Sequence, residues 1–237
     1  MGVFSGPEIN EDGLVLALDA ANTKSYPSSG GSTWYDLSGN GNNGTITNAT
    51  FNSDGYFAFD GSGDYVSFAS ASELQFLNRS PYTMEVWMYP TSNPGSSTWT
   101  GIFNREDNSG GSRDGYNIYL NGNRSVTSFY LATERFQSGT NNSIGTTYDN
   151  SDLLNIWSHI VVTYDGTTLR LYRNGVQSNS TTSTGNITNT SKTLEMGRRG
   201  TGSYFTGRLT GQKIYKKALT AAEVKQNFNA TRGRFGI

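Results

Sequence analysis

Acidic side chains that could perform catalysis are scattered along the 237-residue chain. Glu85 stands alone in the β-rich run 82–89, and Glu106 and Asp107 are consecutive, so their side chains diverge. Retaining hydrolysis of a glycosidic bond needs two carboxyl groups about 5 Å apart. His159 is the only histidine, and no acid adjoins it in the sequence to tune it as a base. We therefore expect a structural role for His159 and no enzymatic activity.

A polar stretch from Arg105 to Gly115 supplies the side chains best suited to bind a ligand, because long loops of a β-sandwich often carry its binding site. Its carboxylate and amide oxygens are of the kind that calcium prefers. A solvated loop without a ligand is the alternative. The candidate ligand-binding residues in and beside this stretch are Asn104, Asp107, Asn108, Asp114 and Tyr116.

A second group of candidates lies near the C-terminal end. Arg198, Arg199 and Arg208 could form a basic patch that pairs with carboxylates on a sugar or on a neighbouring subunit, although such groups are often ordinary surface. Aromatic rings near loops could stack against a sugar, whereas Trp87 and Trp157 are expected to pack inside. The ring candidates are Tyr116, Tyr130, Phe136, Tyr148 and Tyr204. From this region we select Arg198, Arg199 and Tyr204 as ligand-binding residues.

Composition narrows the class of partner. The formal net charge of −1 gives no overall field that would attract nucleic acid. No window approaches the 18 apolar residues of a membrane span, and the absence of cysteine excludes disulfides and thiolate metal sites. We expect no nucleic acid partner, no membrane insertion and no required cofactor, with a single weak calcium ion as the open alternative.

Short β-rich runs joined by 29 glycines and many turn residues predict an all-β sandwich. The clearest signal spans 160–176, where two β-rich runs flank Asp165-Gly166 and Asn174-Gly175 closes the second run as a type I′ turn. The runs 56–59 and 65–68 have the spacing of a hairpin. The chain between residues 26 and 52 is a long structured loop or several short strands.

One helix is expected near the C-terminus. Thr220 and Glu223 have the spacing of a capping box, and Val224 and Phe228 should face inward. We divide the chain into an N-terminal arm, residues 1–12, a domain, residues 13–228, and a C-terminal tail, residues 229–237. Both ends are predicted to contact other subunits of an assembly, frayed termini being the alternative.

An ordered set of segments resembles the laminin G-like and pentraxin-like branch of the concanavalin A-like lectin/glucanase superfamily over residues 55–228. The segments are Phe59-Asp60-Gly61 with Asp64-Tyr65-Val66, residues 82–87, residues 157–166, residues 171–175, and Ile214-Tyr215 followed by residues 218–223. The resemblance implies an all-β, two-sheet antiparallel jelly roll with one short C-terminal helix. Pentraxin-like relatives bind calcium at the loop that matches 105–115 and at a later acidic cluster, so the resemblance implies Asp107 and Asp114 as the ligands of any bound metal ion. This chain departs from that pattern, since Arg198 and Arg199 stand where acids are expected.

The segments 13–22 and 34–44, together with 228–235, are similar to laminin G-like structural proteins of tailed bacteriophages. This resemblance implies a virion surface protein that decorates the head or contributes to the tail or a fibre. Its partners would be other virion proteins, a possible second copy of itself and host-surface carbohydrate. The alternatives are a carbohydrate-binding module of a secreted bacterial protein, which would be extracellular or at the bacterial cell surface, and a glycoside hydrolase.

Overall fold

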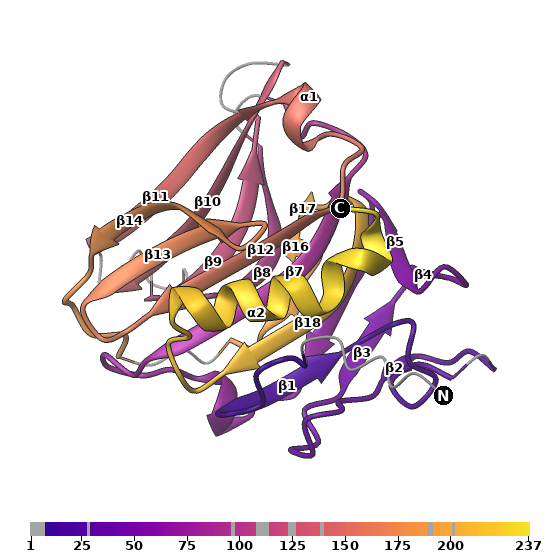
Figure 1. The fold of residues 1–237 in the computed structure, drawn as a ribbon, viewed down its shortest axis with the longest axis horizontal. Helices are drawn as coiled ribbons and strands as arrows, with labels where there is room; N and C mark the ends of the chain where they lie inside the picture. Colours follow the sequence, from indigo (N-terminus) through magenta and orange to yellow (C-terminus); the bar gives the residue numbers. More distant parts are fainter. Residues whose placement is uncertain are drawn as a thin grey trace.

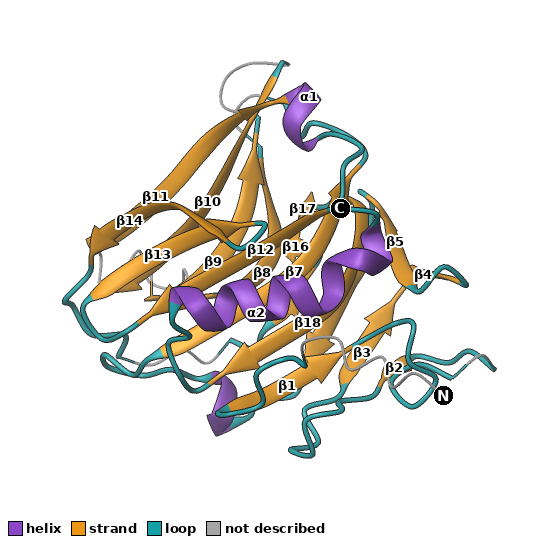
Figure 2. Ribbon diagram, viewed as in Figure 1, coloured by secondary structure: helices purple, strands orange, loops and turns teal. Residues whose placement is uncertain are grey.

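The β-rich runs of the sequence form strands that pair into two large antiparallel sheets (Figures 1 and 2). The structure is a computed structural model that describes residues 8–27, 29–95, 98–107, 114–122, 127–137, 140–188, 192–200 and 202–237. The predicted all-β jelly-roll fold with a short C-terminal helix is confirmed. Within the described residues, no helix is long and apolar enough to cross a membrane.

Sheet A contains eight strands, of which β1 (Leu14–Leu18) pairs with β18 outside the main order. That order is β14 (Val176–Thr182), β13 (Thr168–Arg173), β12 (Ser158–Tyr164), β7 (Tyr82–Pro90), β18 (Thr206–Tyr215), β5 (Tyr56–Asp60) and β4 (Thr50–Asn52).

Sheet B also contains eight strands, in the order β11 (Thr140–Asp149), β10 (Ser128–Gln137), β9 (Asp114–Asn121), β8 (Trp99–Asp107), β15 (Glu195–Met196), β6 (Tyr65–Phe68), β3 (Gly44–Thr47) and β2 (Thr33–Trp34). A separate small hairpin is made by β16 (Arg198–Arg199) and β17 (Ser203–Tyr204). The described helices are η1 (Ser72–Leu74), α1 (Asn150–Leu153), α2 (Ala221–Thr231) and η3 (Arg232–Phe235).

The inner faces of the two sheets bury one large apolar core, whose removal from water drives folding.

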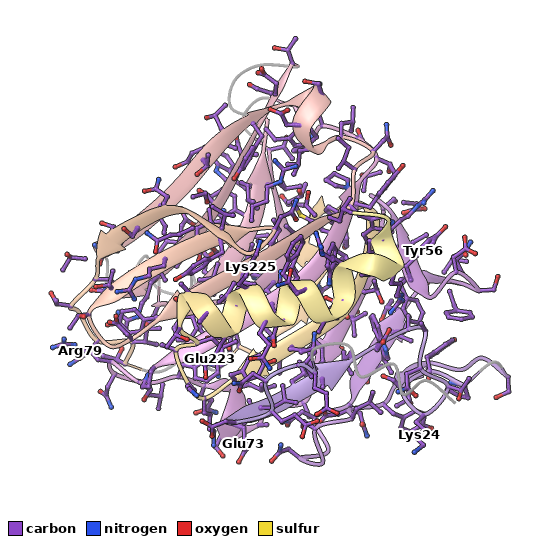
Figure 3. The ribbon with its side chains drawn as sticks, in the orientation of Figure 1. Lys24, Tyr56, Glu73, Arg79, Glu223 and Lys225 are labelled. Carbon is purple, nitrogen blue, oxygen red and sulfur yellow. The ribbon has the colours of Figure 1, made fainter. Side chains whose placement is uncertain are left out.

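Local signals in the sequence are confirmed where the partners are close in the chain. β12, β13 and β14 form the predicted antiparallel meander, and Asn174 and Gly175 both have the positive φ of a type I′ turn, 52° and 75°. The capping box at α2 is complete, since Thr220 and Glu223 exchange hydrogen bonds; Figure 3 labels Glu223 on this helix. Val224 is fully buried, as expected for the inward face of α2.

The predicted hairpin of residues 56–59 and 65–68 is wrong. β5 pairs with β4 and β18 in sheet A, whereas β6 pairs with β3 and β15 in sheet B. The Asp60–Asp64 turn carries the chain from one sheet to the other, and the backbone N–H of Asp60 donates to Asp64 Oδ2 at 2.8 Å. Turn residues alone do not specify which strands they connect.

The outer face of sheet A is covered by α2, which lies across the sheet in Figure 1. Beneath the helix, Glu85 accepts hydrogen bonds from Lys213 Nζ at 2.6 Å and from Asn227 Nδ2 at 2.7 Å. His159 Nε2 lies 3.1 Å from the same carboxylate. The expectation that Glu85 stands alone and that His159 has no acid beside it is therefore corrected. Both side chains are completely buried, so this pair reaches no substrate.

The two ends of the chain pack on this same face. The backbone N–H of Asn10 donates to Asn227 Oδ1 at 2.7 Å, and the carbonyl of Glu8 accepts from Gln226 on α2. The helix continues through Thr231, past the predicted domain end at residue 228. Phe235 of η3 then stacks on Trp87 with ring centroids 4.0 Å apart. Residues 8–12 and the helical residues after 228 thus contact their own domain; residues 1–7 lie outside the described part.

Candidate functional site

A cavity of about 600 Å³ opens on the outer face of sheet B, beside the small hairpin of β16 and β17. Its size lies within the range of ligand-binding pockets, about 300–1,000 Å³. The residues that line it are Trp99, Asn104, Glu106, Glu134, Lys192, Thr193, Glu195, Arg198, Arg199, Gly200 and Ser203.

Strand register creates the polar floor of this cavity. Asn104 on β8 is directly opposite Glu195 on β15 and Asn117 on β9, and Asn117 is in turn opposite Glu134 on β10. Residues opposite one another in an antiparallel sheet point to the same face. Four polar side chains from four strands therefore lie in one row. The sequence separation between these strands explains why no local motif indicated the row.

The hairpin of β16 and β17 forms a wall of the cavity and requires a glycine beneath it. A Cβ on Gly101 of β8 would collide with the carbonyl of Arg198, so the close approach of β16 to β8 depends on the missing side chain. Arg198 and Arg199 are placed in the cavity wall by this contact. Ser203 pairs with Arg199 across the hairpin and completes the wall.

Each arginine of the wall is held by carboxylates of the floor. Arg198 donates to Glu195 through Nε at 2.8 Å and also through Nη2. Arg199 joins two acids, with Nε 3.0 Å from Glu106 Oε2 and Nη2 2.9 Å from Glu134 Oε2. These charge-assisted contacts fix the orientation of both guanidinium groups.

Two residues that line the cavity, Trp99 and Asn104, are of particular interest for ligand binding. Trp99 is 43% exposed, which is unusual for so large an apolar side chain. Asn104 is only 7% exposed, yet its Oδ1 accepts no hydrogen bond within the described residues. A buried acceptor without a donor costs about 1–3 kcal/mol, which a ligand donor would recover. Trp99 and Asn104 are five residues apart on β8, so a ligand that meets both the ring and the amide would have to extend along the strand, as an oligosaccharide could.

The predicted site residues separate into three groups. Asn104, Arg198 and Arg199 are brought together in the cavity. Tyr204 is opposite Arg198 in the hairpin and lines an adjoining cavity of about 230 Å³ that also includes Ser203. Asn108 lies outside the described residues, as does the side chain of Asp107.

Other predicted site residues lie elsewhere. Tyr116 is fully buried, its hydroxyl donates to the carbonyl of Leu74, and it does not line the cavity; Phe136 is also buried. Arg208 lies on sheet A between the rings of Tyr56 and Tyr89, with its Cζ 4.7 and 4.5 Å from their centroids. The three arginines therefore do not form one patch.

Strands replace much of the predicted loop at 105–115. β8 extends to Asp107 and β9 begins at Asp114, whose carboxylate accepts from the backbone N–H of Thr188 at 3.0 Å. Arg105 is buried in the sheet. Within the described residues, no group of three His, Cys, Asp or Glu side chains could hold a metal ion. Calcium at Asp107 and Asp114 stays a prediction.

Sequence reasoning missed Trp99, Glu134, Lys192 and Glu195, and it treated Glu106 as part of a loop. One signal was available: Asn104 and Glu106 are two residues apart, which places them on one face of a strand. The remaining members come from β10, β15 and the segment before β15, and only the tertiary fold joins them.

Solved structures with the same fold include bacterial toxin binding domains. The binding domain of Paraclostridial Mosquitocidal Protein 1 superposes with a TM-score of 0.72 at 22% identity, over 92% of this chain and 52% of that one. The receptor binding domain of botulinum neurotoxin type G gives a TM-score of 0.69 at 17% identity, over 92% and 51%. The chain thus spans about half of each domain, and at these identities the likeness concerns the fold.

No curated protein matches the chain. The family model described as the concanavalin A-like lectin/glucanases superfamily, a laminin G-type domain, matches residues 60–225. This range includes both sheets' central strands, the hairpin of β16 and β17 and the first half of α2. The chain therefore belongs to the concanavalin A-like lectin/glucanases superfamily.

Proposed function

We propose that this protein is a glycan-binding surface component of a bacteriophage virion, and that the cavity on sheet B is its binding site. The observation that carries the glycan site is that one cavity is lined by the partly exposed ring of Trp99 and by Asn104, whose buried Oδ1 has no hydrogen-bond partner within the described residues. Aromatic rings stack on the apolar faces of sugars, while amides and charged groups bind the hydroxyls around them.

The lectin-like fold and its likeness to a toxin's receptor binding domain support recognition of a surface ligand. The virion assignment is supported by the phage-like segments 13–22, 34–44 and 228–235. The arrangement of faces agrees with both roles, because Asn10 and Phe235 pack on the outer face of sheet A and the cavity opens on sheet B. Attachment to virion proteins through one face would leave the other free.

Replacing Trp99 with Ala tests the glycan site. We expect at least a tenfold loss of affinity for the best glycan of an array, because the stacking surface is removed. The melting temperature should change less than for a core tryptophan, since 43% of Trp99 is exposed. Tyr35→Ala is the matched control, because Tyr35 is an aromatic residue of similar exposure, 45%, outside the lining of the cavity. Equal affinity of wild type and Trp99→Ala would reject this site.

Mass spectrometry of purified virions tests the location. Recovery of the protein in stoichiometric amount with head, tail or fibre proteins supports the virion assignment. Recovery only from the medium of a bacterial culture would favour the alternative, a carbohydrate-binding module of a secreted protein. Glycoside hydrolysis has less support, because Arg199 bonds to both Glu106 and Glu134 and occupies the space between them that a scissile bond would need.

A further inference from the structure

The cavity on sheet B contains as many acidic as basic side chains. Three glutamates, Glu106, Glu134 and Glu195, face two arginines and Lys192. A cavity built to hold an anionic sugar would be expected to present a guanidinium fork to the ligand. Whether Arg198 and Arg199 are available to a ligand therefore bears directly on the charge of the ligand that the cavity accepts.

Arg198 forms a bidentate ion pair with Glu195. Two nitrogens of its guanidinium donate to the two oxygens of this carboxylate, and the group lies over the ring of Tyr65 at 3.5 Å. Hydrogen bonding with Glu195 raises the pKa of Arg198 above its already high usual value. The pair is only about one fifth exposed, so an incoming carboxylate would have to displace Glu195 and leave that charge without its partner.

Arg199 is likewise paired with carboxylates of the cavity. It bridges Glu106 and Glu134, both more than nine-tenths buried, and lies 5.0 Å from the ring centre of Tyr119. An anionic ligand group placed beside these two carboxylates would meet like charge. The unsatisfied group of the floor, Asn104 Oδ1, is an acceptor and needs a hydrogen-bond donor.

We propose that the cavity selects uncharged glycans, whose hydroxyl groups donate to Asn104, and that Glu195 excludes acidic glycans by neutralising Arg198. This inference rests on the proposed glycan site and names its ligand class. Selectivity arises because Asn104 can accept a hydrogen bond from a glycan hydroxyl. The guanidinium groups of Arg198 and Arg199 are already paired with glutamates, so neither is available to bind an anionic group of the ligand.

Matched pairs of oligosaccharides test the proposal, each neutral glycan being compared with the same glycan ended by a carboxylate-bearing sugar. Isothermal titration with wild type should give at least tenfold tighter binding of the neutral member. Glu195→Gln frees Arg198 and should improve affinity for the acidic member at least tenfold, with a smaller change for the neutral one. Glu195→Asp is the control, because it keeps the negative charge and the preference for neutral glycans.

Arg198→Met provides a second variant that does not depend on the folding of Glu195→Gln. It leaves the charge of Glu195 uncompensated, so discrimination against acidic glycans should increase. Tighter binding of acidic glycans by wild type would overturn the inference and leave the proposed function standing. An unchanged ratio in folded Glu195→Gln would also overturn it. Binding of no glycan at all, neutral or acidic, would overturn both proposals.

Discussion

Two networks of ion pairs that involve glutamates lie on the outer faces of the two sheets, and they differ in what covers them. On sheet A, Glu85 bonds to Lys213 and Asn227 under α2 and is fully removed from water. On sheet B, Arg199 joins Glu106 and Glu134 at the edge of an open cavity. The same side-chain chemistry therefore attaches a helix in one region and lines a candidate binding site in the other. The presence or absence of a covering helix decides whether such a network supports the fold or can contact a ligand.

The largest expected effect is on the covered network. Glu85→Gln removes the charge that compensates buried Lys213, so the free energy of unfolding should fall by about 3–5 kcal/mol. Glu195→Gln, at the open cavity, should cost clearly less, because Glu195 and Arg198 each keep about one fifth of their side-chain surface in water. Urea unfolding of both variants measures the difference. Similar losses would contradict the distinction between the two regions.

The pH dependence of stability sharpens the same contrast. Burial alone would raise the pKa of Glu85, but the charges of Lys213 and then His159 outweigh it and hold this pKa well below its usual value of 4.5. The stabilisation is therefore complete above about pH 4.5 and is lost as the pH falls through the lowered pKa, because the unfolded chain takes up the proton first. Unfolding free energies measured from about pH 5 to pH 3 should fall more steeply for wild type than for Glu85→Gln. Parallel curves would show that Glu85 carries no such linkage.

The fold could be predicted where its determinants are local. Thr220 with Glu223, and Asn174 with Gly175, are signals within four residues, and both correspond to the structure. The destination of β6 after the Asp60–Asp64 turn could not be predicted in this way, because its partners β3 and β15 come from distant parts of the chain.

Only part of the candidate site could be predicted, because its residues are brought together by strand pairings between distant parts of the chain. Asn104, Arg198 and Arg199 were identified, but Glu134 reaches the cavity only through the pairing of β10 with β9 and of β9 with β8. The burial of Tyr116 could have been predicted. Tyr116 alternates with Ile118 along β9, and that spacing places both side chains on the buried face of the strand.

The smallest expected effect on stability is at Asn104, and it separates a binding residue from a structural one. Its Oδ1 has no donor among the residues that the structure describes, so Asn104→Leu removes an uncompensated acceptor. This variant should leave the free energy of unfolding unchanged or raise it by up to about 1 kcal/mol. Asn117→Leu is the matched control in the same row. Its amide donates to Glu134 at 3.1 Å and accepts from the Glu134 backbone at 3.0 Å, so this variant should lose about 1–3 kcal/mol.

Binding should change in the opposite sense, because Asn104→Leu removes the acceptor that the glycan is expected to satisfy. We expect at least a tenfold loss of affinity for the best glycan, with the fold preserved. A loss of stability as large as that of Asn117→Leu would mean that the Asn104 amide supports the sheet. Unchanged stability with unchanged affinity would mean that the ligand does not reach this amide, and the cavity would then have to bind through Trp99 and the ion pairs alone.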